Sequence, residues 1–423
     1  MSIVRNSAWN VIGVVIPTLV TIPTMAIYSR LLGVERLGLL MLTFAVVGYA
    51  SSFDLGLSRA LIRQVSIHID DSGAVKSFMG TTTAFVGAIS LVLGAVIWAG
   101  TPWLADYLKV SPVNRADAIA GLHWLSLSVP PYLLSVVGTA YFEGKEDFRM
   151  LNVIRCSTGV LNGVAGVASV YIVPTLWSAV AALCASRWLL CIAVFVLYRA
   201  DANRRDPAGR PALWTFDPAA LRSSLSYGGW LTVSNIIGPV MTYFDRFVLS
   251  HMAGAQVVAF YTVPAEIINR LLLFPGAISR ALFPRLSKRQ HTAGADRRLG
   301  AVLMFVCAAV AFVPVFALAP LLLRVWMGPA YGAEPATVLR ILLVGFFFNS
   351  LGFGPFTDLQ ARGYSKTTAL IHVVEVLPYL CALIVLTYLY GIAGTAIAWT
   401  ARSTVDYVLM QMYSQRLSEA RVP

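Results

Sequence analysis

Charged side chains are scarce in this chain. Only 12% of its 423 residues are Asp, Glu, Lys or Arg, whereas 58% are hydrophobic and the mean hydropathy is +0.73. A water-soluble protein commonly has about a quarter charged residues. So few charges cannot cover a surface that faces water. We therefore expect lipid to be the solvent for much of this protein.

Cysteine and histidine are also rare. The five cysteines lie inside apolar stretches, as small core residues do, and the five histidines form no metal-ligand spacing. Residues 138–146 resemble a phosphate-binding loop, but the spacing is one residue too long and Glu146 stands where Ser or Thr is needed. We expect no enzyme, no cofactor and no ATPase domain. Transport would then use an ion gradient, the membrane potential or the gradient of the substrate itself, and the sequence leaves H⁺ and Na⁺ open as a coupling ion.

Long apolar runs replace the missing charge. A spanning helix needs roughly 20 apolar residues, and a β-barrel would instead show short segments of alternating polarity. The sequence predicts an all-α polytopic membrane protein of about twelve helices. The predicted spans are residues 7–30, 38–65, 77–102, 117–142, 149–172, 176–199, 223–250, 256–283, 299–323, 336–359, 365–390 and 393–415.

The net charge of +12 determines the expected orientation. Lys and Arg gather in the loops that follow every second predicted span, such as those containing Lys145, Arg204, Arg289 and Arg362. Because cytoplasmic loops carry this excess, we expect both termini in the cytoplasm and the positive charge to reflect topology rather than nucleic-acid binding.

Two halves of six predicted spans each are separated by the longest polar break. The expected division is an N-terminal six-helix bundle at 1–200, a cytoplasmic linker at 201–222 and a C-terminal six-helix bundle at 223–423. Glycines follow the first and seventh spans (Gly33, Gly254) and the fourth and tenth spans (Gly144, Gly363) at nearly the same offset. These matching glycine positions predict a parallel pseudo-repeat, an arrangement found among transporters.

Ionisable residues inside the spans are the candidate site, because a charge in the bilayer costs several kcal/mol and is by default functional. An arginine suits phosphate, since its planar fork binds two oxygens. The candidate cavity residues for substrate binding are Arg30, Arg59, Arg246 and Arg270. The candidate coupling or charge-balancing residues are Asp54, Asp245, Glu266 and Glu375.

The alternative is that these charges are structural. Glu266 and Arg270, one helical turn apart, and Asp54 with Arg59 could be ion pairs between helices. Arg30, at the end of its span, could extend to the membrane interface. Arg155, Arg187, Arg402 and Asp406 form a second group of ionisable residues in the spans.

The stretch 28–38, Tyr-Ser-Arg-Leu-Leu-Gly-Val-Glu-Arg-Leu-Gly, followed by Phe-Asp-Leu-Gly-Leu at 53–57, resembles the opening of Wzx-type polysaccharide-biosynthesis flippases of the MOP superfamily. The resemblance implies a V-shaped, MATE-like pair of bundles around a cationic cavity. It also implies that a lipid-linked oligosaccharide, carried on undecaprenyl diphosphate, moves from the cytoplasmic to the periplasmic leaflet for O-antigen or exopolysaccharide synthesis. Carried over by position, Arg30, Asp54, Arg59, Arg246 and Arg270 match charged cavity residues.

Three functions remain open at this point. The leading hypothesis is the flippase, a monomer in the bacterial inner membrane, with a polysaccharide polymerase and chain-length proteins as candidate partners. The second is a MATE-like, ion-coupled drug or metabolite antiporter, which would favour a carboxylate-rich cavity. The third is a membrane polymerase or glycosyltransferase, for which the outer loops near 103–116 and 324–335 are short.

Overall fold

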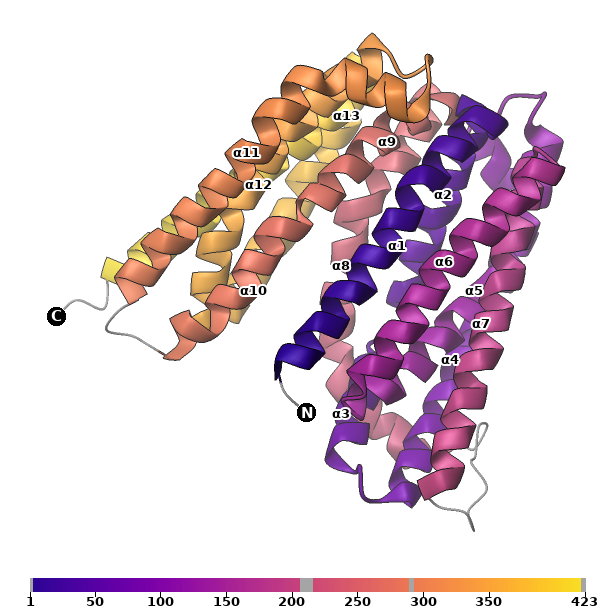
Figure 1. Cartoon of the computed structure of the whole chain (residues 1–423), viewed down its shortest axis with the longest axis vertical. Helices are drawn as coiled ribbons and strands as arrows, with labels where there is room; N and C mark the ends of the chain where they lie inside the picture. The colour runs from indigo at the N-terminus through magenta and orange to yellow at the C-terminus, as the bar shows by residue number, and fades with distance from the viewer. Residues whose placement is uncertain (1–2, 206–215, 289–292, 420–423) are drawn as a thin grey trace. The chain divides into compact units, whose positions relative to one another are not determined.

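The computed structural model describes residues 3–205, 216–288 and 293–419, and these ranges contain helices without any strand (Figure 1). The helices are α1 (Ile3–Leu32), α2 (Val34–Ala50), the 3₁₀ turn η1 (Ser51–Asp54), α3 (Leu57–Ile67), α4 (Ser72–Tyr107), α5 (Arg115–Gly144), α6 (Phe148–Ile172), α7 (Leu176–Arg205), α8 (Pro218–Ala253), α9 (Ala255–Leu271), α10 (Leu273–Lys288), α11 (Ala293–Met327), α12 (Ala333–Ala361) and α13 (Ser365–Glu419).

Nine helical stretches among the described residues are long and apolar enough to cross a bilayer. One of them lies in α13, which contains two predicted spans joined at Gly391. α2 has 17 residues and α8 has 36, so both reach spanning length. With the halves of α13 counted separately and with α2 and α8 added, the described ranges hold the twelve long segments that the sequence predicts.

The predicted continuous span 38–65 is wrong, because the helix breaks in its middle. α2 ends at Ala50, η1 follows, and Leu55 and Gly56 are left-handed, with φ of 53° and 72°. The Asp54 carboxylate accepts the Gly56 backbone N–H at 2.9 Å. An Asx turn of this kind offers the backbone a partner outside the helix and so stabilises the break.

The two glycines of the predicted repeat occupy the same structural position. Gly33 ends α1 with φ of 78°, and Gly254 ends α8 with φ of 93°. Each is followed by a helix of 17 residues, α2 and α9. Only glycine adopts such a φ without a steric penalty, so both positions need this residue to redirect the chain. The parallel repeat itself stays a prediction.

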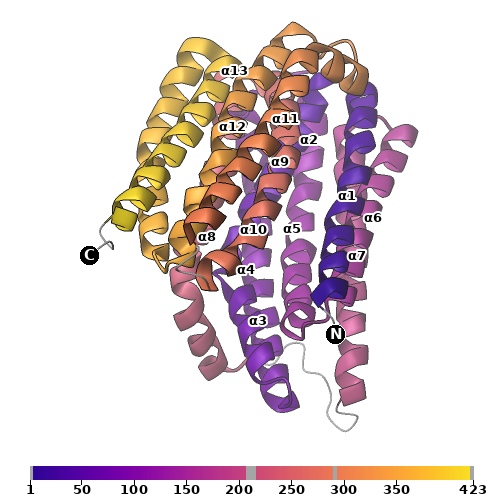
Figure 2. The same ribbon diagram turned by 60° about the vertical axis from the view of Figure 1, so that its left-hand side comes forward.

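Contacts between Cα atoms divide the chain into two compact units, Met1–Phe244 and Asp245–Pro423. In the first unit α5 packs against α2, α3, α4 and α7, and α1 lies along α6 (Figure 1). In the second unit α12 packs against α9, α10, α11 and α13, and Figure 2 shows it between α11 and α13. The unit boundary falls inside α8. The predicted linker 201–222 lies partly outside the described residues, and the division into six-helix bundles stays a prediction.

Among the nine candidate spans, α5 is the most deeply buried in the first unit and α12 in the second, and we call these two the interior helices. The apolar window of α5 is 72% buried and that of α12 is 50% buried, whereas that of α11 is only 11% buried. Between residues 299 and 323 of α11 the exposed side chains, including Val306, Val310 and Val313, are apolar. Such a surface would be unfavourable in water, so the exposed face of α11 fits contact with lipid tails.

The start of α8 is tied to α4 within the first unit. Asp217 precedes Pro218, and its carboxylate accepts the Ala219 N–H at 2.9 Å, as an N-cap residue does. The Ser77 hydroxyl donates to the other carboxylate oxygen at 2.9 Å and holds the pKa of Asp217 below its ordinary value. Ser77, which makes this contact, directly follows the basic residue Lys76.

The two halves of α13 form a tight hairpin. Gly391 leaves the helical region with φ of 57°, and the Thr387 and Thr395 hydroxyls meet at 2.9 Å across the bend. A Cβ atom on Gly394 would lie 1.8 Å from the Leu386 carbonyl oxygen and 3.0 Å from the Thr387 backbone nitrogen. The backbone approach therefore requires glycine at position 394.

We predict that Gly394→Ala destabilises the protein by about 1–3 kcal/mol, because the added methyl group overlaps backbone atoms that cannot rotate away. The thermal midpoint of the purified protein, followed by circular dichroism, should fall. Gly100→Ala in α4 is the control, since no heavy atom lies within 4 Å of its Cβ position. Equal midpoints for both variants would contradict this description of the hairpin.

Candidate functional site

A chain of alternating charges joins α8 to α9 in the second unit. One guanidinium nitrogen of Arg246 lies 3.3 Å from Glu266 Oε1, and one of Arg270 lies 3.7 Å from Glu266 Oε2. Glu266 and Arg270 are one turn apart on α9 and so share a face. The predicted Glu266–Arg270 ion pair is therefore present, and the structure adds Arg246 as a second partner of the same carboxylate.

Asp245 has its own partners. One carboxylate oxygen accepts the Tyr261 hydroxyl at 2.5 Å, and the other accepts the Arg246 backbone N–H at 2.7 Å. Asp245 is 3% exposed. Because an ionised carboxylate in such a place must be hydrogen-bonded, Tyr261 is the residue that makes Asp245 tolerable inside the membrane. The sequence gave no reason to single out Tyr261.

Exposure rises along the charge chain. The side chain of Arg246 is 4% exposed, that of Glu266 is 21% and that of Arg270 is 35%. Arg246 is thus enclosed and has the Glu266 carboxylate as a charge partner. Arg270 is the member that a ligand can reach, and its longer contact with Glu266 is the easier one to exchange for another anion.

The residues predicted in the first unit are arranged differently. Asp54 is buried and is engaged in the turn with Gly56, whereas Arg30 and Arg59 are exposed. No Asp54–Arg59 ion pair occurs among the described residues. Asp54 therefore has a structural role in breaking the helix, and the two arginines are left as the cationic candidates of this unit.

Glu375 is the remaining predicted residue, and it lies on the first half of α13. It is 5% exposed, and neither carboxylate oxygen has a hydrogen-bond partner among the described residues. His372 on the same half and Asp406 on the second half lie beside it, with ligand atoms of all three within 4.8 Å of one another. The sequence placed Asp406 in its second group and did not select His372.

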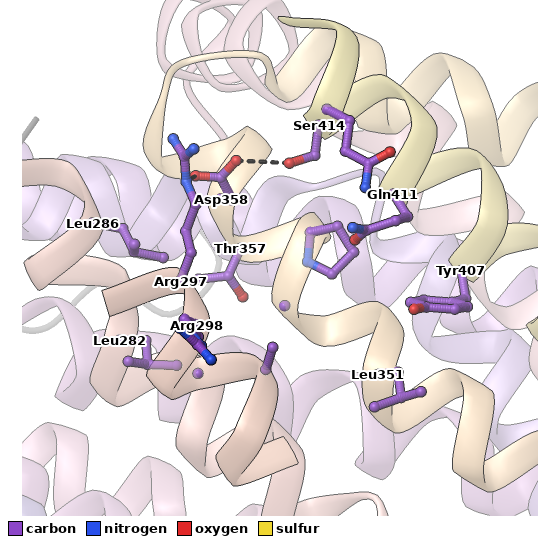
Figure 3. Close-up of a pocket in the computed structure, with 15 residues that line it drawn as sticks. Leu282, Leu286, Arg297, Arg298, Leu351, Thr357, Asp358, Tyr407, Gln411 and Ser414 are labelled. Atoms are coloured by element: carbon purple, nitrogen blue, oxygen red, sulfur yellow. Dashed lines mark hydrogen bonds and ion pairs between the residues drawn. The ribbon is translucent and has the colours of Figure 1, made fainter. Parts of the chain in front are cut away.

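A pocket of about 460 Å³ opens in the second unit, and Arg297 and Arg298 are among the residues that line it (Figure 3). Asp358, 3% exposed, accepts from Arg297 Nε at 2.7 Å, Ser414 Oγ at 2.8 Å and Arg362 at 3.2 Å. These contacts tie the ends of α11, α12 and α13 together. The sequence identified Arg362 only as a loop charge, whereas Arg362 and Arg297 both contact this buried carboxylate.

The first unit has a comparable connection at the end of α7. Asp201 accepts from Tyr141 at 2.6 Å and from Lys145 Nζ at 2.6 Å. Lys145 and Arg362 both follow the interior helix of their unit, α5 or α12. In both units an acid, half-buried Asp201 or buried Asp358, pairs with a base that follows the interior helix and fixes that helix to its neighbour.

Comparisons with known proteins agree with this architecture. The profile of a family described as Polysaccharide biosynthesis protein matches residues 3–290. The putative O-antigen transporter of Shigella flexneri is 36% identical over 421 residues, which are 99% of each chain. The lipopolysaccharide biosynthesis protein WzxC of Escherichia coli (strain K12) is 23% identical over 290 residues, 68% of this chain and 55% of that protein.

Solved structures of the MOP superfamily have the same fold. An inward-facing multidrug resistance MATE transporter matches with a TM-score of 0.78 and 15% identity, over 97% of this chain and 99% of the other. The lipid II flippase MurJ, in an inward closed conformation, matches with a TM-score of 0.78 and 12% identity, over 97% and 87%. These likenesses confirm the predicted fold class, an all-helical polytopic membrane protein.

We predict that Tyr261→Phe destabilises the protein by about 1–3 kcal/mol, because it removes the hydroxyl donor from a buried carboxylate. The thermal midpoint of the purified protein should fall. Tyr388→Phe is the matched control, since Tyr388 is 79% exposed and the loss of its hydroxyl leaves no buried acid unpaired. If the two variants unfold at the same temperature, Tyr261 does not stabilise Asp245.

Proposed function

The chain belongs to the polysaccharide biosynthesis protein family, and from this premise we propose that it moves an undecaprenyl-diphosphate-linked oligosaccharide from the cytoplasmic to the periplasmic leaflet. It is a flippase-type membrane transporter of the MOP superfamily and is not an enzyme, as its relatives are transporters. The lipid carrier and the direction are parts of the proposal.

The observation that carries the substrate assignment is the half-exposed guanidinium of Arg270 beside Glu266. A diphosphate presents several anionic oxygens to a planar fork of donors, which can bind them in pairs. When the substrate approaches, Arg270 exchanges Glu266 for phosphate. Glu266 remains neutralised by Arg246, so the exchange leaves no buried charge without a partner.

Arg246 and Arg270 therefore differ in role within this proposal. Arg270 contacts the diphosphate or an acidic sugar, and Arg246 positions Glu266. Arg30 and Arg59, both exposed, are proposed to contribute positive charge in the first unit. Alternating access would then expose the bound headgroup first to one side of the membrane and then to the other.

The proposed setting is the bacterial inner membrane, with twelve crossings and both termini in the cytoplasm. The basic loops support this orientation, because cytoplasmic loops carry the excess of Lys and Arg. We propose a monomer that delivers its substrate to a polysaccharide polymerase and chain-length proteins.

A drug or metabolite antiporter is the second candidate for this fold. Cationic drugs would require an accessible carboxylate. In the α8–α9 charge chain the most exposed member is an arginine, and the carboxylate of Asp245 is enclosed with Tyr261. This arrangement favours an anionic substrate over a cationic drug.

We predict that Arg270→Ala lowers polymer export at least about tenfold, the effect of losing about 1.4 kcal/mol of charge-assisted binding. Export is measured as surface O-antigen in a strain that lacks its own O-antigen transporter and is complemented with this chain. Membrane abundance of the variant, measured by immunoblot, should be unchanged because Arg270 is partly exposed.

Arg155→Ala is the matched control. Arg155 on α6 also lies 3.7 Å from a glutamate, Glu143, and its side chain is 48% exposed. The Arg155→Ala variant should export polymer normally. Arg270→Lys should retain part of the export, because lysine keeps the positive charge but lacks the planar guanidinium that binds two oxygens. Full export by Arg270→Ala would exclude the assigned role.

A further inference from the structure

The cluster of His372, Glu375 and Asp406 is the most unusual group in the second unit. His372 Nδ1 lies 3.7 Å from Asp406 Oδ1 across the α13 hairpin, and the ligand atoms of the three residues lie within 4.8 Å of one another. The three side chains come from two antiparallel halves of one element, and the bend at Gly391 is what brings them together.

Glu375 has no hydrogen-bond donor among the described residues that would compensate its burial. It is 5% exposed, and both of its carboxylate oxygens lack a hydrogen bond in the part of the chain that the structure describes. An ionised, unpaired carboxylate inside a membrane protein is strongly unfavourable. Glu266, Asp245 and Asp358, by contrast, all have donors. Glu375 therefore needs a species that neutralises its charge.

The neighbours of the cluster on the elements packed around it are one arginine and several apolar groups. On α13, Arg402 interacts electrostatically with Glu375 and Asp406, and its guanidinium lies 5.5 Å from the centre of the Tyr379 ring. On α12, the faces nearest the cluster are apolar: the Phe356 ring is 6.1 Å from His372, and Gly352 adjoins Asp406.

The next layer consists of α8 and α9. Asp245 of α8 interacts electrostatically with Arg402, and Tyr261 of α9 with Tyr379. The backbone of Arg246 and the Tyr261 hydroxyl already satisfy the Asp245 carboxylate. Arg402 is thus the basic neighbour that Glu375, Asp406 and Asp245 have in common.

The formal charge of the cluster indicates which ion would balance it. Two carboxylates and one arginine leave one negative charge when His372 is neutral. A single proton or monovalent cation balances it, whereas a divalent metal would overshoot next to Arg402. Na⁺ is a hard cation that prefers an all-oxygen shell, and an imidazole is a poor member of such a shell. An imidazole between two acids is, however, well suited to exchange a proton.

We propose that His372, Glu375 and Asp406 together hold one exchangeable proton, and that this proton is the coupling ion of the carrier. The coupling role rests on the proposed function, whereas the proton site itself does not. With the proton bound, the cluster and Arg402 are together neutral. When it leaves, Glu375 and Asp406 repel each other across the α13 hairpin, which gives proton release a mechanical consequence for the second unit.

The test is infrared spectroscopy of the full-length protein in lipid nanodiscs. A protonated buried carboxylic acid has its own C=O stretching band. We expect this band in the wild type at neutral pH, its loss as the pH is raised, and its absence in Glu375→Gln. The isosteric change keeps the fold, which the thermal midpoint checks. Glu375→Gln should also reduce surface O-antigen at least about tenfold in the complementation assay.

Glu35→Gln is the matched control, since Glu35 is a partly buried carboxylate that already accepts the Ser111 N–H, the Ser111 hydroxyl and the Asn114 amide. It should leave the band unchanged. A band that persists in Glu375→Gln, or that millimolar Na⁺ or Zn²⁺ removes from the wild type, would overturn the proton site.

Loss of the band with normal polymer export would overturn the coupling role. The proposed function can fail separately: a wild-type chain that shows the band but restores no surface polymer would refute the flippase assignment and leave the proton site intact.

Discussion

Every polar group that this chain carries into the membrane must find its partner within the protein, because hydrocarbon offers none. That constraint explains most of the interior contacts. Asp245 is held by Tyr261, Asp201 by Lys145, and Asp358 by two arginines and a serine. Each contact joins two or more helices. The few charges that the chain retains thus connect its helices as well as mark its site.

The same constraint separates structural charges from functional ones. Asp358 is buried and accepts from Arg297, Arg362 and Ser414, and Asp54 is buried and accepts the Gly56 N–H, so both carboxylates have a structural contact in their own unit. The Arg270 side chain is 35% exposed, and it shares the Glu266 carboxylate with Arg246. Glu375 is enclosed and has no hydrogen-bond donor in the described ranges of the chain. An accessible base and a buried acid without a hydrogen-bond donor among the described residues are what the proposed substrate binding and proton coupling use.

The spans and the Glu266–Arg270 pair could be predicted from the sequence because apolar length and the spacing of one helical turn are local properties. The break at Asp54 could not, since it depends on one side chain competing with the helix for a backbone N–H. The Arg246–Glu266 contact joins two helices, and the His372–Asp406 contact needs the chain to reverse at Gly391. Such contacts depend on the tertiary fold, which periodicity does not reveal.

The central claim is that this chain carries a lipid-linked oligosaccharide across a bilayer. It is tested most directly with purified protein in liposomes that contain a fluorescent undecaprenyl-diphosphate oligosaccharide in both leaflets. A membrane-impermeant reductant destroys the fluorophore in the outer leaflet only. We expect wild-type protein to make nearly all the fluorescence accessible to the reductant, while protein-free liposomes keep their inner-leaflet fraction. Retention of that protected fraction in liposomes containing folded protein and a proton gradient would contradict the account.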